Sequence, residues 1–161
     1  MPERVECDVL IVGGGLVGSA LALALRSIPV RVVLVEARDP RVLEQPRFDG
    51  RGTALANGSQ RLLAQPGLRD GRHASAQPIR SIHIGQRGRF GAARIEAREE
   101  GVAALGFTVE NRVLGEVMWR RLAAADPEFR CFAPATLARF AAQADSVVAE
   151  VDAAGRRTEV R

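Results

Sequence analysis

The first forty residues carry two short apolar runs on either side of a glycine-rich break. Residues 8–12 form a mostly apolar, β-branched run of the kind found in buried parallel strands. Three glycines interrupt it, and the Ala- and Leu-rich residues 16–26 then predict a helix. Pro29 ends the helical region, and residues 30–36 predict a second strand. The order strand, turn, helix, strand indicates a βαβ unit.

The central part of the chain predicts a loop, a helix and a hairpin. Residues 37–51 contain two prolines and several charges and are expected to form a loop, whereas residues 53–63 predict a helix. Residues 79–84 and 89–97 predict two strands joined at a turn over residues 86–88. This pair would belong to a second sheet.

The last third of the chain predicts one helix and three strands. Apolar residues at three- and four-residue spacing predict a helix that begins at Asn111 and is stopped by Asp126 and Pro127. The strands expected after it are residues 129–132, 146–151 and 157–160, the last two joined at Ala154-Gly155.

The glycine-rich break has the spacing of a dinucleotide-binding turn, with Gly13, Gly15 and Gly18 between a strand and a helix. Gly13 would permit the tight turn, Gly15 would let a diphosphate approach the backbone, and Gly18 would let the helix pack closely on the strands. The N-terminus of the helix offers free N–H groups and the positive end of its dipole to phosphates. A structural turn without a ligand is the alternative, but the three glycines of this pattern reduce stability without such a use.

Glu36 stands at the end of the second strand, about twenty residues after the turn, where dinucleotide-binding units place an acid. Its carboxylate can accept hydrogen bonds from both ribose hydroxyls of an adenosine, and it would repel a 2′-phosphate. NADP is therefore disfavoured at this site. The local chemistry hardly separates FAD from NAD, but the long loop after Glu36 is unlike the further βα unit of a NAD dehydrogenase, which favours FAD.

Charge and composition exclude several other functions. All 23 basic residues are arginines, scattered among 19 acids without a basic run or interleaved aromatics, so nucleic-acid binding is not expected. The two cysteines and two histidines have no metal-ligand spacing, and no metal site is expected. No signal peptide and no transmembrane segment is visible. The expectation is a cytoplasmic protein, with peripheral contact to the inner membrane left open.

Four further stretches resemble one family of flavoenzymes: residues 34–38, 48–56, 104–112 and 131–135. With residues 8–18, they are similar to the FAD-dependent aromatic hydroxylases of the para-hydroxybenzoate hydroxylase fold, within them most to the ubiquinone-biosynthesis hydroxylases. The fold class is then α/β, a Rossmann-like FAD/NAD(P)-binding domain with a parallel sheet plus part of a second, antiparallel sheet. Residues 1–161 would be an incomplete FAD-binding domain, with residues 78–110 starting a substrate-domain sheet.

The resemblance also implies site residues. The arginine matching Arg51 would lie near the diphosphate and ribityl part of FAD, with Thr53 and Ala54 beside the flavin ring, whereas a solvated loop arginine is the alternative for Arg51. Arg112 would contact the cofactor, and Asn111 would do so or simply cap a helix. No catalytic residue is assigned, and Trp119 is expected to serve packing. The expected cofactor-binding residues are Gly13, Gly14, Gly15, Leu16, Val17, Gly18, Glu36, Ala37, Arg38, Arg51, Thr53, Ala54 and Arg112.

The implied reaction is hydroxylation of a prenylated phenol of ubiquinone biosynthesis with O₂ and a reduced donor, for which NAD(P)H is an option. The implied partners are this aromatic, membrane-dissolved substrate and other proteins of ubiquinone biosynthesis. Two further cofactor motifs of the family do not occur in these residues, so we expect the front part of a longer protein, inactive by itself. A non-catalytic FAD-binding scaffold and another FAD- or NAD-dependent oxidoreductase remain the alternatives.

Overall fold

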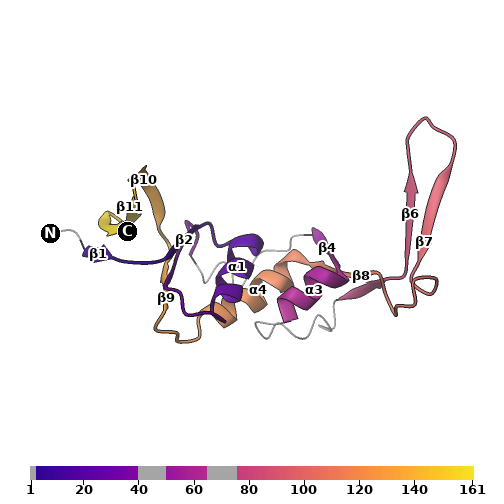
Figure 1. Cartoon of the computed structure of the whole chain (residues 1–161), viewed down its shortest axis with the longest axis horizontal. Helices are drawn as coiled ribbons and strands as arrows, with labels where there is room; N and C mark the ends of the chain where they lie inside the picture. Colours follow the sequence, from indigo (N-terminus) through magenta and orange to yellow (C-terminus); the bar gives the residue numbers. More distant parts are fainter. Residues whose placement is uncertain (1–2, 40–49, 65–75) are drawn as a thin grey trace. The chain divides into compact units, whose positions relative to one another are not determined.

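A computed structural model describes residues 3–39, 50–64 and 76–161, without the side chains of Leu62 and Ala64. The chain divides into two compact units. The first comprises Met1–Phe48 and Leu114–Arg161, and the second comprises Asp49–Val113. Figure 1 labels most of their helices and strands.

A three-stranded parallel sheet forms one half of the first unit. It consists of β2 (Val9–Val12), β3 (Val32–Val35) and β9 (Phe129–Phe132), in the order β2-β3-β9. All four residues of β3 are buried, as its apolar sequence and central place require. Helix α1 (Leu16–Leu25) connects β2 to β3. The predicted βαβ unit is therefore confirmed, and the predicted strand at residues 129–132 joins its sheet.

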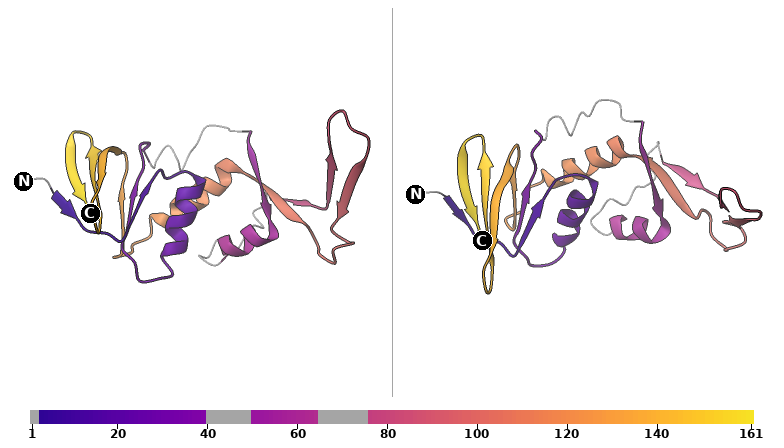
Figure 2. Two further views of the ribbon diagram at one scale, coloured as in Figure 1. Left: turned by 45° about the horizontal axis from the view of Figure 1, so that its top comes forward. Right: turned by 90° about the horizontal axis from the view of Figure 1, so that it is seen from above.

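A four-stranded sheet forms the other half of the first unit, in the order β1-β12-β11-β10. Strands β11 (Val147–Ala153) and β12 (Arg156–Val160) form the predicted hairpin. Ala154 and Gly155, with φ of 54° and 85°, make its turn. Strands β1 (Glu3–Val5) and β10 (Thr136–Ala142) were not predicted. Figure 2 shows β1 beside the hairpin, where it pairs parallel to β12.

The two sheets of the first unit share an apolar core. Val33 and Val35 of β3 pack in one cluster with residues of the four-stranded sheet, namely Val5, Ala149, Val151 and Val160. Because side chains alternate along a strand, Val32 and Leu34 point to the opposite face of β3. The continuous apolar run of β3 thus serves both faces of the parallel sheet.

Arg26, just after α1, holds the end of helix α4 (Asn111–Leu122). Its Nη1 donates to the carbonyl of Arg121 at 2.6 Å, and its Nη2 donates to those of Leu122 and Ala124 at 2.9 and 3.1 Å. Its Nε lies 3.1 Å from Asp126 Oδ2. A cation at a helix C-terminus also opposes the negative end of the helix dipole. Helix α4 begins at the predicted residue but ends at Leu122, four residues before Asp126.

The second unit has two small antiparallel sheets. Strands β4 (Gly52–Ala56), β8 (Gly106–Glu110) and β5 (Gln77–Ile79) pair in the order β4-β8-β5, beside helix α3 (Asn57–Ala64). Strands β6 (Ser81–Gly85) and β7 (Ala92–Glu96) form a separate hairpin, as Figure 1 shows. The predicted second sheet at this hairpin is confirmed.

Two predictions for the second unit were wrong in detail. The helix expected over residues 53–63 begins only at Asn57, because residues 53–56 pair with β8 as strand β4. The strand expected over residues 79–84 is divided between β5 and β6, which belong to different sheets. Strand β8 was not predicted at all.

Within the described residues, no helix is long and apolar enough to cross a membrane.

Candidate glycine-turn site

The turn between β2 and α1 shows why two of its glycines cannot be replaced. Gly13 has φ of +104°, a backbone conformation that residues with a side chain rarely adopt. Its N–H donates to Val35 O at 2.8 Å. A Cβ on Gly18 would lie 1.9 Å from the Gly13 carbonyl oxygen. Gly13 therefore makes the turn and Gly18 lets the helix pack against it, which are the roles predicted from the spacing.

Gly15 has a different environment, because a Cβ built on it would meet nothing within 4 Å. Its φ of −67° would also accept a side chain. Neither strain nor packing within the described residues thus explains a glycine here. The backbone at Gly15 is open, as the predicted approach of a diphosphate requires, and that approach stays a prediction.

The start of α1 presents backbone donors to solvent. The first intrahelical bond is donated by Ser19 N to Gly15 O at 2.9 Å. Among the described residues, the N–H groups of Leu16, Val17 and Gly18 have no acceptor, as expected for a first helical turn. Val17 is 84 % exposed. These amides and the helix dipole suit an anion such as a diphosphate.

Glu36 joins the glycine turn directly. Its carboxylate is buried, with Oε2 2.6 Å from the backbone nitrogen of Gly14 and Oε1 2.9 Å from that of Arg38. The Nε of Arg38 lies 3.6 Å from Glu36 Oε1. Ala37, between these two residues in the chain, is exposed. A carboxylate has about four acceptor positions, so further donors such as ribose hydroxyls can still bind. The sequence motif did not predict these backbone bonds.

Sequence reasoning missed the part that Trp119 plays in this turn. Its side chain is 5 % exposed, and its Nε1 donates to the carbonyl of Gly14 at 2.9 Å. Ser19 Oγ donates to the same oxygen at 2.8 Å. Packing was expected for Trp119 and is confirmed, but the hydrogen bond adds a polar role. The two residues are 105 positions apart, so no local pattern could have signalled this contact.

The remaining candidate residues lie in the second unit. Thr53 Oγ1 lies 2.5 Å from Asn111 Oδ1, and Asn111 N donates to Arg51 O at 3.0 Å. The Nη2 of Arg112 lies 3.5 Å from Glu110 Oε2. Ala54 is exposed on β4. The structure thus brings Arg51, Thr53 and Asn111 together, while their contact with a cofactor stays a prediction.

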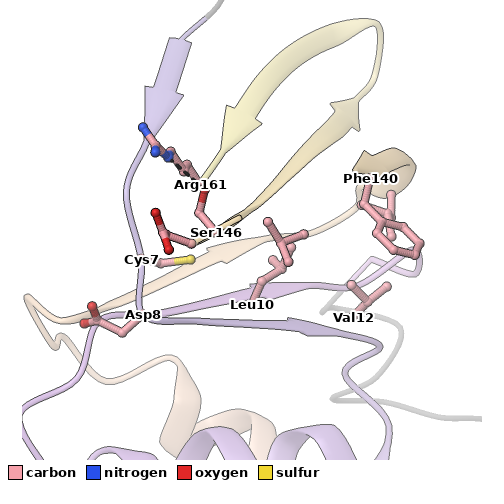
Figure 3. Close-up of a pocket in the computed structure, with 10 residues that line it drawn as sticks. Cys7, Asp8, Leu10, Val12, Phe140, Ser146 and Arg161 are labelled. Carbon is pink, nitrogen blue, oxygen red and sulfur yellow. Dashed lines mark hydrogen bonds between the residues drawn. The ribbon is translucent and has the colours of Figure 1, made fainter. Parts of the chain in front are cut away.

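A pocket in the first unit lies outside the glycine turn. Figure 3 shows Leu10 and Val12 of β2 on one side of it and Phe140 of β10 on another. Cys7, Asp8 and Arg161 line its other end. Hydrogen bonds from Arg31 lower the pKa of Asp8 to about 2, so this carboxyl is poorly suited to proton transfer near neutral pH. We assign no chemistry to this pocket.

The thiol of Cys131 in β9 has a strongly raised pKa. Desolvation of the thiol, and secondly the negative charge of Glu36, raise it to about 11, although the residue as a whole is exposed. Such a thiol is a poor nucleophile. Within the described ranges, no group of three His, Cys, Asp or Glu side chains could hold a metal ion. Among the described residues of the first unit, the open amides at the start of α1 suit a phosphate ligand.

Known proteins share this architecture. A p-nitrophenol 4-monooxygenase from Pseudomonas putida superposes with a TM-score of 0.71 over 99 % of this chain and 39 % of its own, at 20 % identity. A ubiquinone hydroxylase of Rhodospirillum rubrum is 37 % identical over 96 % of this chain and 38 % of its own. The 3-demethoxyubiquinol 3-hydroxylase of Escherichia coli is 32 % identical over 73 % of this chain and 30 % of its own.

The chain spans less than two fifths of the length of these relatives. The family model described as FAD binding domain matches residues 6–159, which include the glycine turn, Glu36 and Trp119. The outward amides of the turn and its buried acid fit the diphosphate and ribose of that cofactor. We conclude that this chain belongs to the FAD binding domain family.

Proposed function

We propose that this chain is the FAD-binding part of a monooxygenase that hydroxylates an aromatic intermediate of ubiquinone biosynthesis. The observation that carries the proposal is the glycine turn, whose free amides and buried acid fit FAD. In addition, 96 % of this chain aligns with a ubiquinone hydroxylase at 37 % identity. When bound, the flavin would supply the redox chemistry that activates O₂ for transfer of one oxygen atom to a phenol ring.

The residues of this chain would bind and orient the cofactor. The amides of Gly15, Leu16 and Val17 would receive the diphosphate, and Glu36 would bind the adenosine ribose. Arg51, Thr53, Ala54 and Arg112 would approach the flavin side of the cofactor, as the family resemblance implies. No residue of this chain is proposed as a catalytic acid or base.

The substrate class follows from the resemblance to ubiquinone hydroxylases, in particular those acting on 2-octaprenyl-6-methoxyphenol. Such a phenol carries a prenyl tail and is dissolved in the membrane, so the protein would meet it at the membrane surface. NAD(P)H would be the reduced donor. Other proteins of ubiquinone biosynthesis would be its partners.

Two experiments test this function. Purified chain is first titrated with FAD, and we expect one flavin per chain, seen as the flavin absorption bands in the protein fraction. Next, the matching segment of the Rhodospirillum rubrum hydroxylase is replaced by this chain and ubiquinone is measured in a strain lacking that enzyme. We expect restored ubiquinone, and none when the replacement carries Gly15→Val.

The alternative outcomes are distinct. Stoichiometric FAD binding without restored ubiquinone would favour a non-catalytic flavin scaffold. Binding of NAD in preference to FAD would favour another oxidoreductase. Absence of any nucleotide binding by the purified chain would contradict the proposal at its base.

A further inference from the structure

The carbonyl of Gly14 is held by side chains from two helices. It precedes α1 and receives no backbone N–H among the described residues, since Ser19 N donates to the next carbonyl, that of Gly15. Its hydrogen bonds come from Ser19 Oγ at 2.8 Å and Trp119 Nε1 at 2.9 Å, and both are buried. The orientation of this peptide group therefore depends on side chains rather than on helix geometry.

The indole of Trp119 also explains why residue 14 is glycine. A Cβ on Gly14 would lie 2.4 Å from Trp119 Cζ2 and 3.1 Å from Glu36 Cβ. The turn is thus enclosed between the indole and the acid. The general dinucleotide-binding pattern leaves this position open to other residues. In this chain, the indole requires glycine.

Fixing this carbonyl fixes the next amide. The Gly14–Gly15 peptide bond is not among the cis bonds of the described chain, and in a planar trans peptide the C=O and the following N–H point in opposite directions. Because the Gly14 carbonyl points inward to Trp119, the Gly15 N–H points outward. Like the amides of Leu16 and Val17, it has no acceptor among the described residues.

We propose that Trp119 is a positioning residue for the diphosphate. Its indole N–H holds the Gly14 peptide in the orientation in which the Gly15 N–H faces the ligand. This inference rests on the proposed FAD binding and adds a residue to that site. Ser19 shares the role, because it donates to the same oxygen. Neither residue would touch the cofactor.

The test compares Trp119→Phe, which keeps an aromatic ring but removes the N–H, with Met118→Leu, a buried neighbour on the same helix. ADP carries the diphosphate and the ribose, whereas adenosine lacks the diphosphate. We expect Trp119→Phe to raise the Kd for ADP about tenfold, the effect of one hydrogen bond, and to leave the Kd for adenosine within about twofold. Met118→Leu should change neither by more than about twofold.

Measurements are made well below the unfolding temperature, so that a general loss of stability does not alter the Kd. Equal losses for ADP and adenosine, or an unchanged Kd for ADP, would overturn the positioning role. Ser19→Ala provides a second variant should Trp119→Phe not fold, and the same selective loss of ADP affinity is expected.

A ligand-free measurement separates this inference from the proposed function. In ¹H–¹⁵N spectra without nucleotide, Trp119→Phe should shift the Gly15 and Leu16 amides more than Met118→Leu does. If the wild-type chain binds no nucleotide, the proposed function fails while these shifts still decide the geometry. If the amides do not move, the positioning role fails even where FAD binds.

Discussion

The carboxylate of Glu36 accepts the backbone N–H of Gly14 at 2.6 Å, which links the acid after β3 to the turn after β2. The two residues are 22 positions apart and buried. The acid is therefore part of the turn before any ribose reaches it. Loss of its carboxylate should affect both the local backbone and ligand binding.

We expect Glu36→Ala to weaken FAD binding by about 1–3 kcal/mol, because charged hydrogen bonds to the ribose and to Gly14 N–H are lost together. Isothermal titration calorimetry with FAD measures the change. Glu6→Gln, an exposed acid in an ion pair with Arg4, serves as the control and should leave the affinity unchanged. Equal affinities of Glu36→Ala and wild type would place the ribose elsewhere.

The glycines of the turn should separate folding from binding. Gly15→Val should leave the free energy of unfolding nearly unchanged, since the space beside Gly15 is open, yet reduce FAD affinity at least about 100-fold by blocking the diphosphate. Gly18→Ala should instead lower the free energy of unfolding by about 3 kcal/mol, because its Cβ would meet the Gly13 carbonyl. Urea unfolding and FAD titration of both variants check this. The opposite assignment of effects would refute the described turn.

Arg26 should be important for the stability of the first unit. Arg26→Ala removes hydrogen bonds to three carbonyls at the end of α4, and we expect a loss of about 2–3 kcal/mol in urea unfolding. Arg26→Lys should recover only part of it, because an ammonium lacks the planar fork of donors. Arg80→Ala, at an exposed arginine of the second unit, is a control and should leave the stability nearly unchanged. A loss below about 0.5 kcal/mol in Arg26→Ala would contradict the described contacts.

The thiol of Cys131 should react slowly. With a pKa of about 11 instead of 9.0, its thiolate fraction at pH 8 is about 100-fold lower. Iodoacetamide labelling of a Cys7→Ser chain should be slower than that of the same chain in urea by about this factor. Glu36→Gln should accelerate labelling of the folded chain, since the charge of Glu36 contributes to the raised pKa. Equal rates in folded and unfolded chain would exclude the raised pKa.

The ion pair of Asp8 and Arg31 should give the fold an acid-dependent contribution. The folded pKa of Asp8 lies near 2, below its usual 3.8, so the carboxylate favours the folded state above pH 4. This contribution is lost as the pH falls through 2. The difference in unfolding free energy between wild type and Asp8→Asn should be constant above pH 5 and shrink toward pH 2. Arg31→Gln should show the same profile, and a flat difference would disprove the coupling.

The sequence predicted those elements whose signals are local. The βαβ unit and the β11–β12 turn depend on glycines and apolar runs within a few residues of each other. Residues 53–56 look helical because Thr-Ala-Leu-Ala favours a helix locally, but pairing with β8, some fifty residues away, makes them a strand. Strand β10 is exposed and Ala-rich, and its partner β11 rather than its own pattern defines it.

The candidate site shows the same limit. Gly13 and Gly18 have the structural roles assigned from their spacing, because both roles follow from the geometry of a tight turn into a helix. The approach of a diphosphate at Gly15 stays a prediction. The roles of Trp119 and Ser19 require knowing that α4 reaches Gly14, which only tertiary structure provides. The contacts of Arg51 and Arg112 with a cofactor remain predictions.

The glycine turn has one side saturated by Glu36, Ser19 and Trp119 and the other side bare. Because these contacts already order the loop before a nucleotide binds, ordering it should cost little of the binding free energy. Folding and flavin uptake should then be successive, separable events. The apoprotein would then be a stable folded species that binds flavin after its synthesis.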